Sequence, residues 1–148
     1  MRKRFGAVLL CLLATTVLSF GRKEETTEQL IARANAARPD QQPDLFMQVA
    51  AREMKAAEEA GKANQSGPLH TALGQIVKYS DSAHSAAMRN NKRIKRTEIK
   101  IREISNKLRG MKLNVDVDDQ PAVQDAIDKL EQFRNELFQS MFGSKSKD

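Results

Sequence analysis

The sequence has 148 residues, and because only 5% of them are aromatic and none is tryptophan, its core should be thin. This length fits a single domain. Three of the 25 basic residues and none of the 19 acidic ones lie in residues 1–21, so the net charge of +6 falls to +3 for the remainder. So small an excess does not indicate a general affinity for nucleic acid.

The only cysteine, Cys11, excludes an internal disulfide and a thiolate zinc site. Leu10 before it does not fit the cleavage site of a lipoprotein.

The beginning of the chain has the pattern of a secretory signal. Basic residues at positions 2–4 precede an apolar stretch over residues 5–20, which is shorter than the roughly 20 residues that a membrane-spanning helix needs. An uncleaved anchor is therefore the less favoured alternative. The small residues Ser19 and Gly21 predict cleavage after Gly21. We therefore expect an exported protein, periplasmic or secreted, that begins at Arg22.

Prolines and glycines are few beyond the signal, and they divide the chain into helical segments. Pro39 and Pro43 separate the first two segments, and the run QSGP at residues 65–68 separates the second from the third. Gly110 and Pro121 lie in the next connection. The sequence predicts a single all-α domain over residues 22–148, with helices at about 25–37, 43–63, 69–111 and 121–142 and a disordered tail at 143–148.

The third segment shows heptad spacing, with apolar or small residues at alternating steps of four and three. The seam consists of Leu69, Leu73, Ile76, Ser80, Ala83, Ala87, Asn90, Ile94, Thr97, Ile101, Ile104, Leu108 and Met111. It predicts one helix of about 40 residues, near 60 Å long at about 1.5 Å per residue. The polar run RNNK at residues 89–92 is the expected position of any break. A break there would fold the same segments into a compact bundle.

The last predicted helix has the apolar stripe and the charge to pair with the second half of this rod. Its stripe consists of Val123, Ala126, Ile127, Leu130, Phe133, Leu137, Phe138 and Met141. Residues 89–109 hold nine basic and two acidic side chains, whereas residues 114–136 hold seven acidic and two basic ones. Antiparallel packing places these charges side by side and sets the register. We expect an elongated antiparallel hairpin or bundle of four helices with one long central helix, whose first half the first two helices cover.

The sequence contains no recognisable catalytic or metal site. His70 and His84 are separated by 14 residues, about 21 Å along one helix, so they cannot share a metal ion. Asp81, one turn before His84, offers only half of a two-ligand site. Asp118 or Asp119 is well placed to cap the last helix. We expect no enzymatic activity, no cofactor and no small-molecule substrate.

The basic stretch at residues 89–109 is the candidate functional region, because its charges can contact anionic lipid headgroups, a polyanionic glycan or an acidic partner. The candidate contacts are Arg89, Lys92, Arg93, Lys95, Arg96 and Lys100. The competing interpretation makes them the solvated face of a two-helix coil, supported by a pair between Glu98 and Arg102 one turn apart. Ile99 lies opposite the seam among these charges. It is a candidate apolar contact for another helix or a second chain.

Two alanine-rich segments, PDLFMQVAAREMKAAEEA at residues 43–60 and LHTALGQIVKYSDSAHSAA at residues 69–87, resemble the helical hairpin domains of unknown function in small exported bacterial envelope proteins. The resemblance implies a helical hairpin and a periplasmic or secreted location. The sequence thus predicts an exported, non-enzymatic interaction or structural module of the cell envelope, whose partner is a protein or a second copy and not nucleic acid. The alternative is a peripheral binder of anionic membrane or polyanionic glycan through residues 89–109.

Overall fold

The computed structural model describes residues 24–143, so the predicted signal peptide and residues 144–148 of the predicted tail lie outside the described residues. Within residues 24–143 the chain forms helices and no strands, which confirms the all-α prediction. The number of helices there is five, where the sequence predicts four. They are α1 (Thr27–Ala36), α2 (Gln42–Lys62), α3 (Ser66–Asn90), α4 (Ile94–Lys112) and α5 (Gln120–Phe142).

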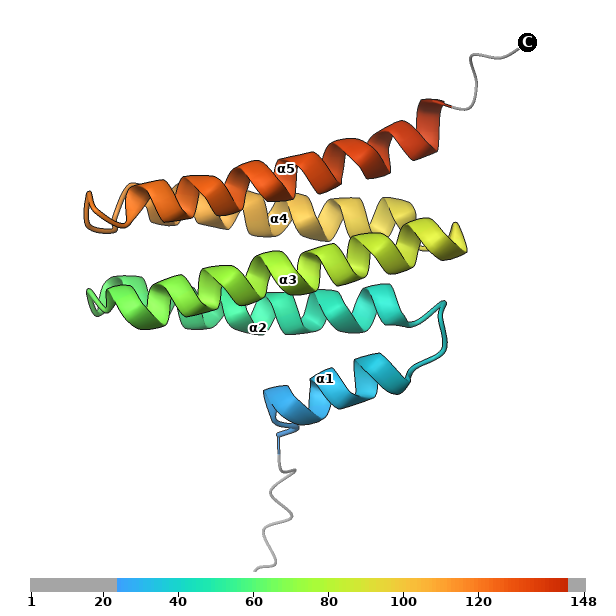
Figure 1. Cartoon of the computed structure of the whole chain (residues 1–148), viewed down its shortest axis with the longest axis horizontal. Helices are drawn as coiled ribbons and strands as arrows, with labels where there is room; N and C mark the ends of the chain where they lie inside the picture. Colours follow the sequence, from blue (N-terminus) through green and yellow to red (C-terminus); the bar gives the residue numbers. More distant parts are fainter. Residues whose placement is uncertain (1–23, 144–148) are drawn as a thin grey trace, which may run out of the picture.

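Helices α2 to α5 run alternately up and down as a four-helix bundle, with α1 along the outside of α2 (Figure 1). The helix α2 packs mainly against α3, and α4 packs mainly against α5. Contacts between α3 and α5 and between α2 and α4 close the bundle. The expectation that the first helix covers the long central one is wrong, because α1 contacts only α2 among the described helices.

The short helix α1 begins at a capping box. The N–H of Gln29 donates to the hydroxyl of Thr26 at 3.2 Å, and the Gln29 side chain accepts from the N–H of Thr26 at 3.0 Å. Leu30 and Ala34, one turn apart, are completely buried. The cap and this narrow apolar face explain why ten residues form an ordered helix beside the bundle.

Small residues bring α2 and α3 close together. Ala50 and Ala57 on α2 and Ala83 and Ala87 on α3 are completely buried. Alanines let the helices approach each other while each buries little area, so larger side chains supply most of the hydrophobic stabilisation. The largest buried side chains include Leu30, Met47, Met54, Leu69, Ile76, Ile101, Leu108, Leu130 and Leu137.

The prediction of one continuous helix over residues 69–111 is wrong. The helix ends at Asn90, and a second one begins at Ile94 and runs back antiparallel to it (Figure 1). Every seam residue except Asn90 is nevertheless buried. Both arms of the hairpin turn the same seam toward one core, so heptad spacing does not distinguish a rod from a hairpin. The alternative of a break near Asn90 with a compact bundle is the arrangement that forms.

Backbone conformation at the α3–α4 connection explains the break. Asn91 and Arg93 have φ of 48° and 65°, in the left-handed region that a right-handed helix cannot include. The N–H of Asn91 donates to the carbonyl of Met88 at 3.4 Å, and the N–H of Lys92 donates to that of Ala87 at 3.3 Å. These two bonds form the Schellman pattern that ends a helix and satisfies its last carbonyls.

A network of charged side chains joins α4 to α5. The Nε atom of Arg134 donates to Glu98 at 2.7 Å, and its Nη1 atom lies 3.0 Å from Glu131. Glu131 also accepts from the hydroxyl of Ser105 at 2.7 Å and pairs with Arg109 at 3.0 Å. Of the two ion pairs between α4 and α5 among the described residues, Arg109–Glu131 joins the predicted basic and acidic excesses. The pair Glu98–Arg134 has the opposite sense, with the acid on α4 and the base on α5.

Candidate functional site

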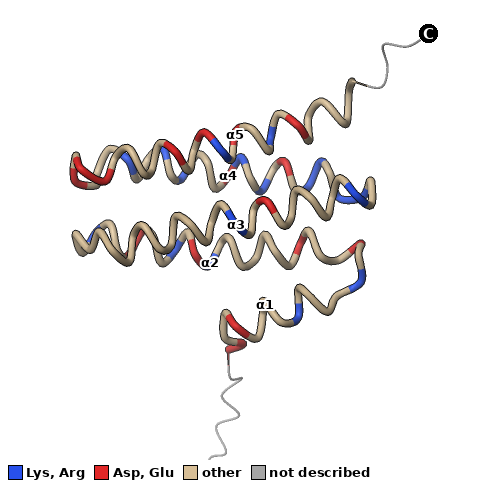
Figure 2. Tube along the Cα trace, in the orientation of Figure 1, with Lys and Arg blue, Asp and Glu red and all other residues tan. Residues whose placement is uncertain are grey.

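The candidate basic residues gather at the end of the bundle where α3 stops and α4 starts, as the blue segments in Figure 2 show. Residues 89–96 contain five Lys or Arg and no acidic residue. The exposed members are Arg89, Lys92, Arg93, Lys95 and Arg96. Lys100, one turn further along α4, is half-buried. We refer to residues 89–96 as the basic end.

One carboxylate from α2 holds part of the basic end in place. Positive side chains in the first turn of α4 oppose the positive end of its helix dipole. Asp44, in the first turn of α2, offsets this charge, since its carboxylate lies 3.1 Å from Nε of Arg96 and 3.6 Å from Nη1 of Arg93. The side chain of Asn90 donates to the carbonyl of Pro39 at 3.1 Å and ties the α3–α4 and α1–α2 connections together.

The remaining cations of the basic end face solvent without acidic partners. Arg89, Lys92 and Lys95 make no ion pair with any other residue of the described chain. Glu98 turns to Arg134 on α5, so the predicted pair between Glu98 and Arg102 does not form. These three cations are therefore available to a ligand or a surface.

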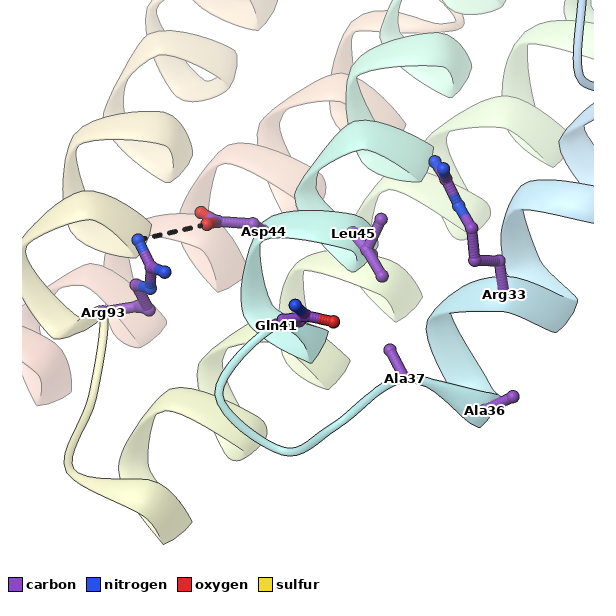
Figure 3. Close-up of a pocket in the computed structure, with 7 residues that line it drawn as sticks. All are labelled: Arg33, Ala36, Ala37, Gln41, Asp44, Leu45 and Arg93. Atoms are coloured by element: carbon purple, nitrogen blue, oxygen red, sulfur yellow. Dashed lines mark ion pairs between the residues drawn. The ribbon is translucent and has the colours of Figure 1, made fainter.

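A shallow pocket of about 530 Å³ lies beside the basic end, between the α1–α2 connection and the start of α4. Figure 3 shows Arg33 and Arg93 on opposite sides of it, with Gln41 and Leu45 between them. Both arginines already have carboxylate partners, since Arg33 lies 3.0 Å from Glu25 and Arg93 pairs with Asp44. The pocket thus has mixed polar and apolar walls and no guanidinium without a carboxylate partner, and its one carboxylate, Asp44, is paired with Arg93 and Arg96.

An aromatic pair near the end of α5 is exposed, contrary to the prediction that Phe138 belongs to a buried stripe. Phe138 and Phe142 are 50% and 57% exposed, and their ring centroids lie 4.7 Å apart. Leu137, the residue directly before Phe138, is completely buried and faces the core. Phe138 points about 100° away from it, because successive helical residues rotate by that angle. The sequence signal for this exposure was the adjacency of two large apolar residues at 137 and 138, of which only one can face the core.

Ile99, the candidate apolar contact, is half-buried on α4. It follows Glu98, whose carboxylate faces α5, and lies one turn after the exposed Lys95. No structural finding assigns a partner to it, so its role stays a prediction.

Asp119 joins the starts of α3 and α5. It is 4% exposed, and its Oδ1 atom accepts from the hydroxyl of Ser66 and lies 2.9 Å from Nε2 of His70. Asp119 occupies the N-cap position of α5, as the prediction of Asp118 or Asp119 allowed, but its side chain makes no capping hydrogen bond to that helix. In a nucleophilic triad the histidine stands between the serine and the acid. Here the acid lies between the other two, so His70 cannot take a proton from Ser66. The hydrogen bonds of the cluster instead connect the start of α5 to the first turns of α3.

His84 is the second histidine site and lies between α3 and α5. Its Nε2 atom is 3.0 Å from Glu136, and its ring stacks on Phe133 with centroids 5.3 Å apart. Although Nε2 lies this close to the Glu136 carboxylate, neither ring nitrogen has the alignment of a hydrogen bond within the described chain. Residues 24–143 contain no cluster of three or more His, Cys, Asp or Glu side chains that could hold a metal ion.

Comparison of the chain with known protein families, characterised proteins and solved structures finds no match. Of the helices between residues 24 and 143, none combines the length and apolar character of a membrane span. The surfaces of the bundle itself therefore provide the evidence on function.

Proposed function

We propose that this chain is an exported, non-enzymatic helical protein that acts as an interaction or structural module in the cell envelope. The observation that carries the proposal is the exposed pair of Phe138 and Phe142. Aromatic side chains concentrate at protein interfaces because they bury much apolar area with few rotatable bonds. Residues 5–20 and the cleavage pattern before Arg22 support export.

Site-specific photocrosslinking in cells tests the contact proposal. A photoreactive phenylalanine analogue at Phe138 should give a discrete crosslinked product in the envelope fraction. The same analogue at Gln132, an exposed residue on α5, is the matched control and should give none. Equal products at both positions, or none at Phe138, would argue against a specific contact.

The export part of the proposal has its own test. Mass spectrometry of the exported protein should find Arg22 at its N-terminus.

We propose as a second candidate function the peripheral binding of an anionic membrane or a polyanionic glycan through residues 89–109. The exposed Arg89, Lys92 and Lys95, which have no ion pair among the described residues, favour this function. Cosedimentation with anionic vesicles and with heparin at low and high salt tests it, because exposed charges are screened over about 8 Å at physiological salt. The charge-reversed variant Lys92→Glu/Lys95→Glu should lose binding. It is a sharper probe than any change at Arg96, which Asp44 already neutralises.

A further inference from the structure

The exposed aromatic pair lies at the level of the basic end along the bundle. Helices α4 and α5 are antiparallel, and Glu98 meets Arg134 at 2.7 Å. Phe138 is four residues beyond Arg134, and Lys95 is three residues before Glu98. At about 1.5 Å per residue they lie about 6 Å and about 4.5 Å further toward the same end. Residues four apart share a helix face, so Phe138 lies on the side of α5 that faces α4.

The other neighbour of α5 leads to the same conclusion. Helix α3 runs parallel to α5, and His84 lies 3.0 Å from Glu136. Met88, one turn beyond His84, is an exposed large apolar residue, and Phe142 is six residues beyond Glu136. Two independent contacts therefore place the exposed apolar side chains of α3 and α5 at the end where Arg89, Lys92 and Lys95 face solvent.

The α4–α5 connection, at the opposite end of the bundle, has the reverse charge. Residues 114–120 of the α4–α5 connection contain three acids and no base. Leu113 and Val117 beside them are strongly exposed apolar residues. Both ends thus expose apolar side chains. At the opposite end the acids of residues 114–120 lie near the exposed Lys62, whereas residues 89–96 combine five cations with no acid.

Exposed apolar side chains beside cations that are unpaired within residues 24–143 match the chemistry of one kind of ligand. A soluble polyanion needs only the cations, and a second copy of the chain needs only the apolar side chains. The headgroup region of an anionic bilayer attracts lysine and arginine, and aromatic rings settle beside it at the boundary with the acyl chains. A surface that carries both features is typical of peripheral contact with such a bilayer.

We propose that Phe138, Phe142 and Met88 together with Arg89, Lys92 and Lys95 form one docking surface for an anionic lipid bilayer. The rings enter the interface, the cations contact lipid phosphates, and the bundle stands end-on with residues 114–120 away from the membrane. This inference rests on the second proposed function and deepens it, since that function requires only the charges.

Binding of lipid vesicles by the protein purified after export tests the docking surface. We expect binding to phosphatidylglycerol-containing vesicles and none to phosphatidylcholine vesicles. Phe138→Ser/Phe142→Ser and Lys92→Glu/Lys95→Glu should each weaken binding by at least about tenfold. The matched control Leu113→Ser/Val117→Ser removes exposed apolar residues from the opposite end and should stay within about twofold of the unchanged protein. Circular dichroism verifies that each variant remains helical.

Fluorescence tests the end-on orientation separately. The chain has no tryptophan, so a single substitution provides a reporter without background. Phe142→Trp should shift its emission to the blue on addition of anionic vesicles, whereas Leu113→Trp at the opposite end should not. Equal shifts at both positions would overturn the orientation.

The other outcomes are equally decisive. If the lysine variant loses vesicle binding and the phenylalanine variant keeps it, the docking surface is refuted while the second proposed function stands. Binding to heparin but to no vesicle also refutes the docking surface and selects a glycan as the ligand of the second function. Binding to neither, with a dimer in sedimentation that Phe138→Ser/Phe142→Ser abolishes, refutes both and assigns the rings to self-association.

Discussion

Glu98 is 6% exposed, and the guanidinium of Arg134 on the neighbouring helix donates to it at 2.7 Å. The buried carboxylate therefore depends on one cation from α5. Arg134→Leu should destabilise the fold by about 3 kcal/mol, because it leaves a buried charge without a partner. Urea unfolding followed by circular dichroism measures this free energy.

Two further variants complete this test. Glu98→Leu/Arg134→Leu should recover most of the lost stability, since replacing a buried ion pair by apolar residues is often neutral. Arg102→Leu changes an exposed arginine on the same helix and should shift stability by less than about 0.5 kcal/mol. An effect of Arg134→Leu as small as that of Arg102→Leu would show that Glu98 is not dependent on the pair.

The stability of the fold should depend on pH through Glu131. Partial burial acts to raise its pKa, but the hydrogen bond from Ser105 and the charges of Arg109 and Arg134 outweigh burial and hold the pKa below its ordinary value. A carboxyl with a lowered folded pKa stabilises the fold above its unfolded pKa and loses this contribution as the pH falls through the folded value. Unfolding free energies measured from about pH 6 down to about pH 3 should therefore fall.

The variant Glu131→Gln isolates this contribution. It cannot titrate, so its unfolding free energy should fall less steeply over the same acid range. Glu103→Gln removes an exposed carboxyl without an ion pair in the described chain and should keep the original slope. Identical slopes for the two variants would show that another group controls acid unfolding.

The left-handed backbone at Arg93 should make glycine the better residue there. Its φ of 65° is strained for a side chain with a Cβ atom, whereas glycine adopts it freely. Arg93→Gly should stabilise the fold by about 1 kcal/mol, and Asp44 keeps Arg96 as a partner. Lys92→Gly, beside it and without a positive φ, is the control and should be neutral or destabilising. Thermal unfolding that ranks the two variants in the opposite order would contradict this prediction.

Two helical glycines should respond differently to alanine. A Cβ atom at Gly74 meets no atom within 4 Å, whereas one at Gly61 comes within 3.1 Å of Val115. Gly74→Ala should stabilise the fold by about 0.5 to 1 kcal/mol, the usual preference for alanine in a helix. Gly61→Ala should gain measurably less in the same urea titration, because Val115 has to move. A gain at Gly61 equal to that at Gly74 would show that the connection after α4 yields freely.

The helical segments and their apolar faces were predictable because spacing along one helix is local information. The heptad seam selected residues that are almost all buried, although it could not exclude the rod. Ending a helix at Asn90 depends on two left-handed residues, and asparagine and arginine adopt that conformation only in particular contexts.

The candidate site was predictable in charge and not in contacts. The exposure of Lys92 and Lys95 was predictable from their charge. Their position at an end of the bundle was not, because the sequence predicted one continuous helix through them. The pairing of Arg96 with Asp44 joins residues 52 positions apart, and the exposure of Phe138 depends on which of two adjacent apolar residues faces the core. Such relationships exist only after the helices have packed.

The seam of the predicted rod continues in phase across residues 91–93, on both sides of the reversal. If that connection became helical, α3 and α4 would each keep their apolar seam. Each seam could then pack against the complementary helices of another molecule. Two chains could then exchange their α4–α5 halves and rebuild both cores without a single altered packing partner. Replacing Asn91 and Arg93 by alanine, which favours the straight form, should therefore produce an intertwined dimer detectable by light scattering.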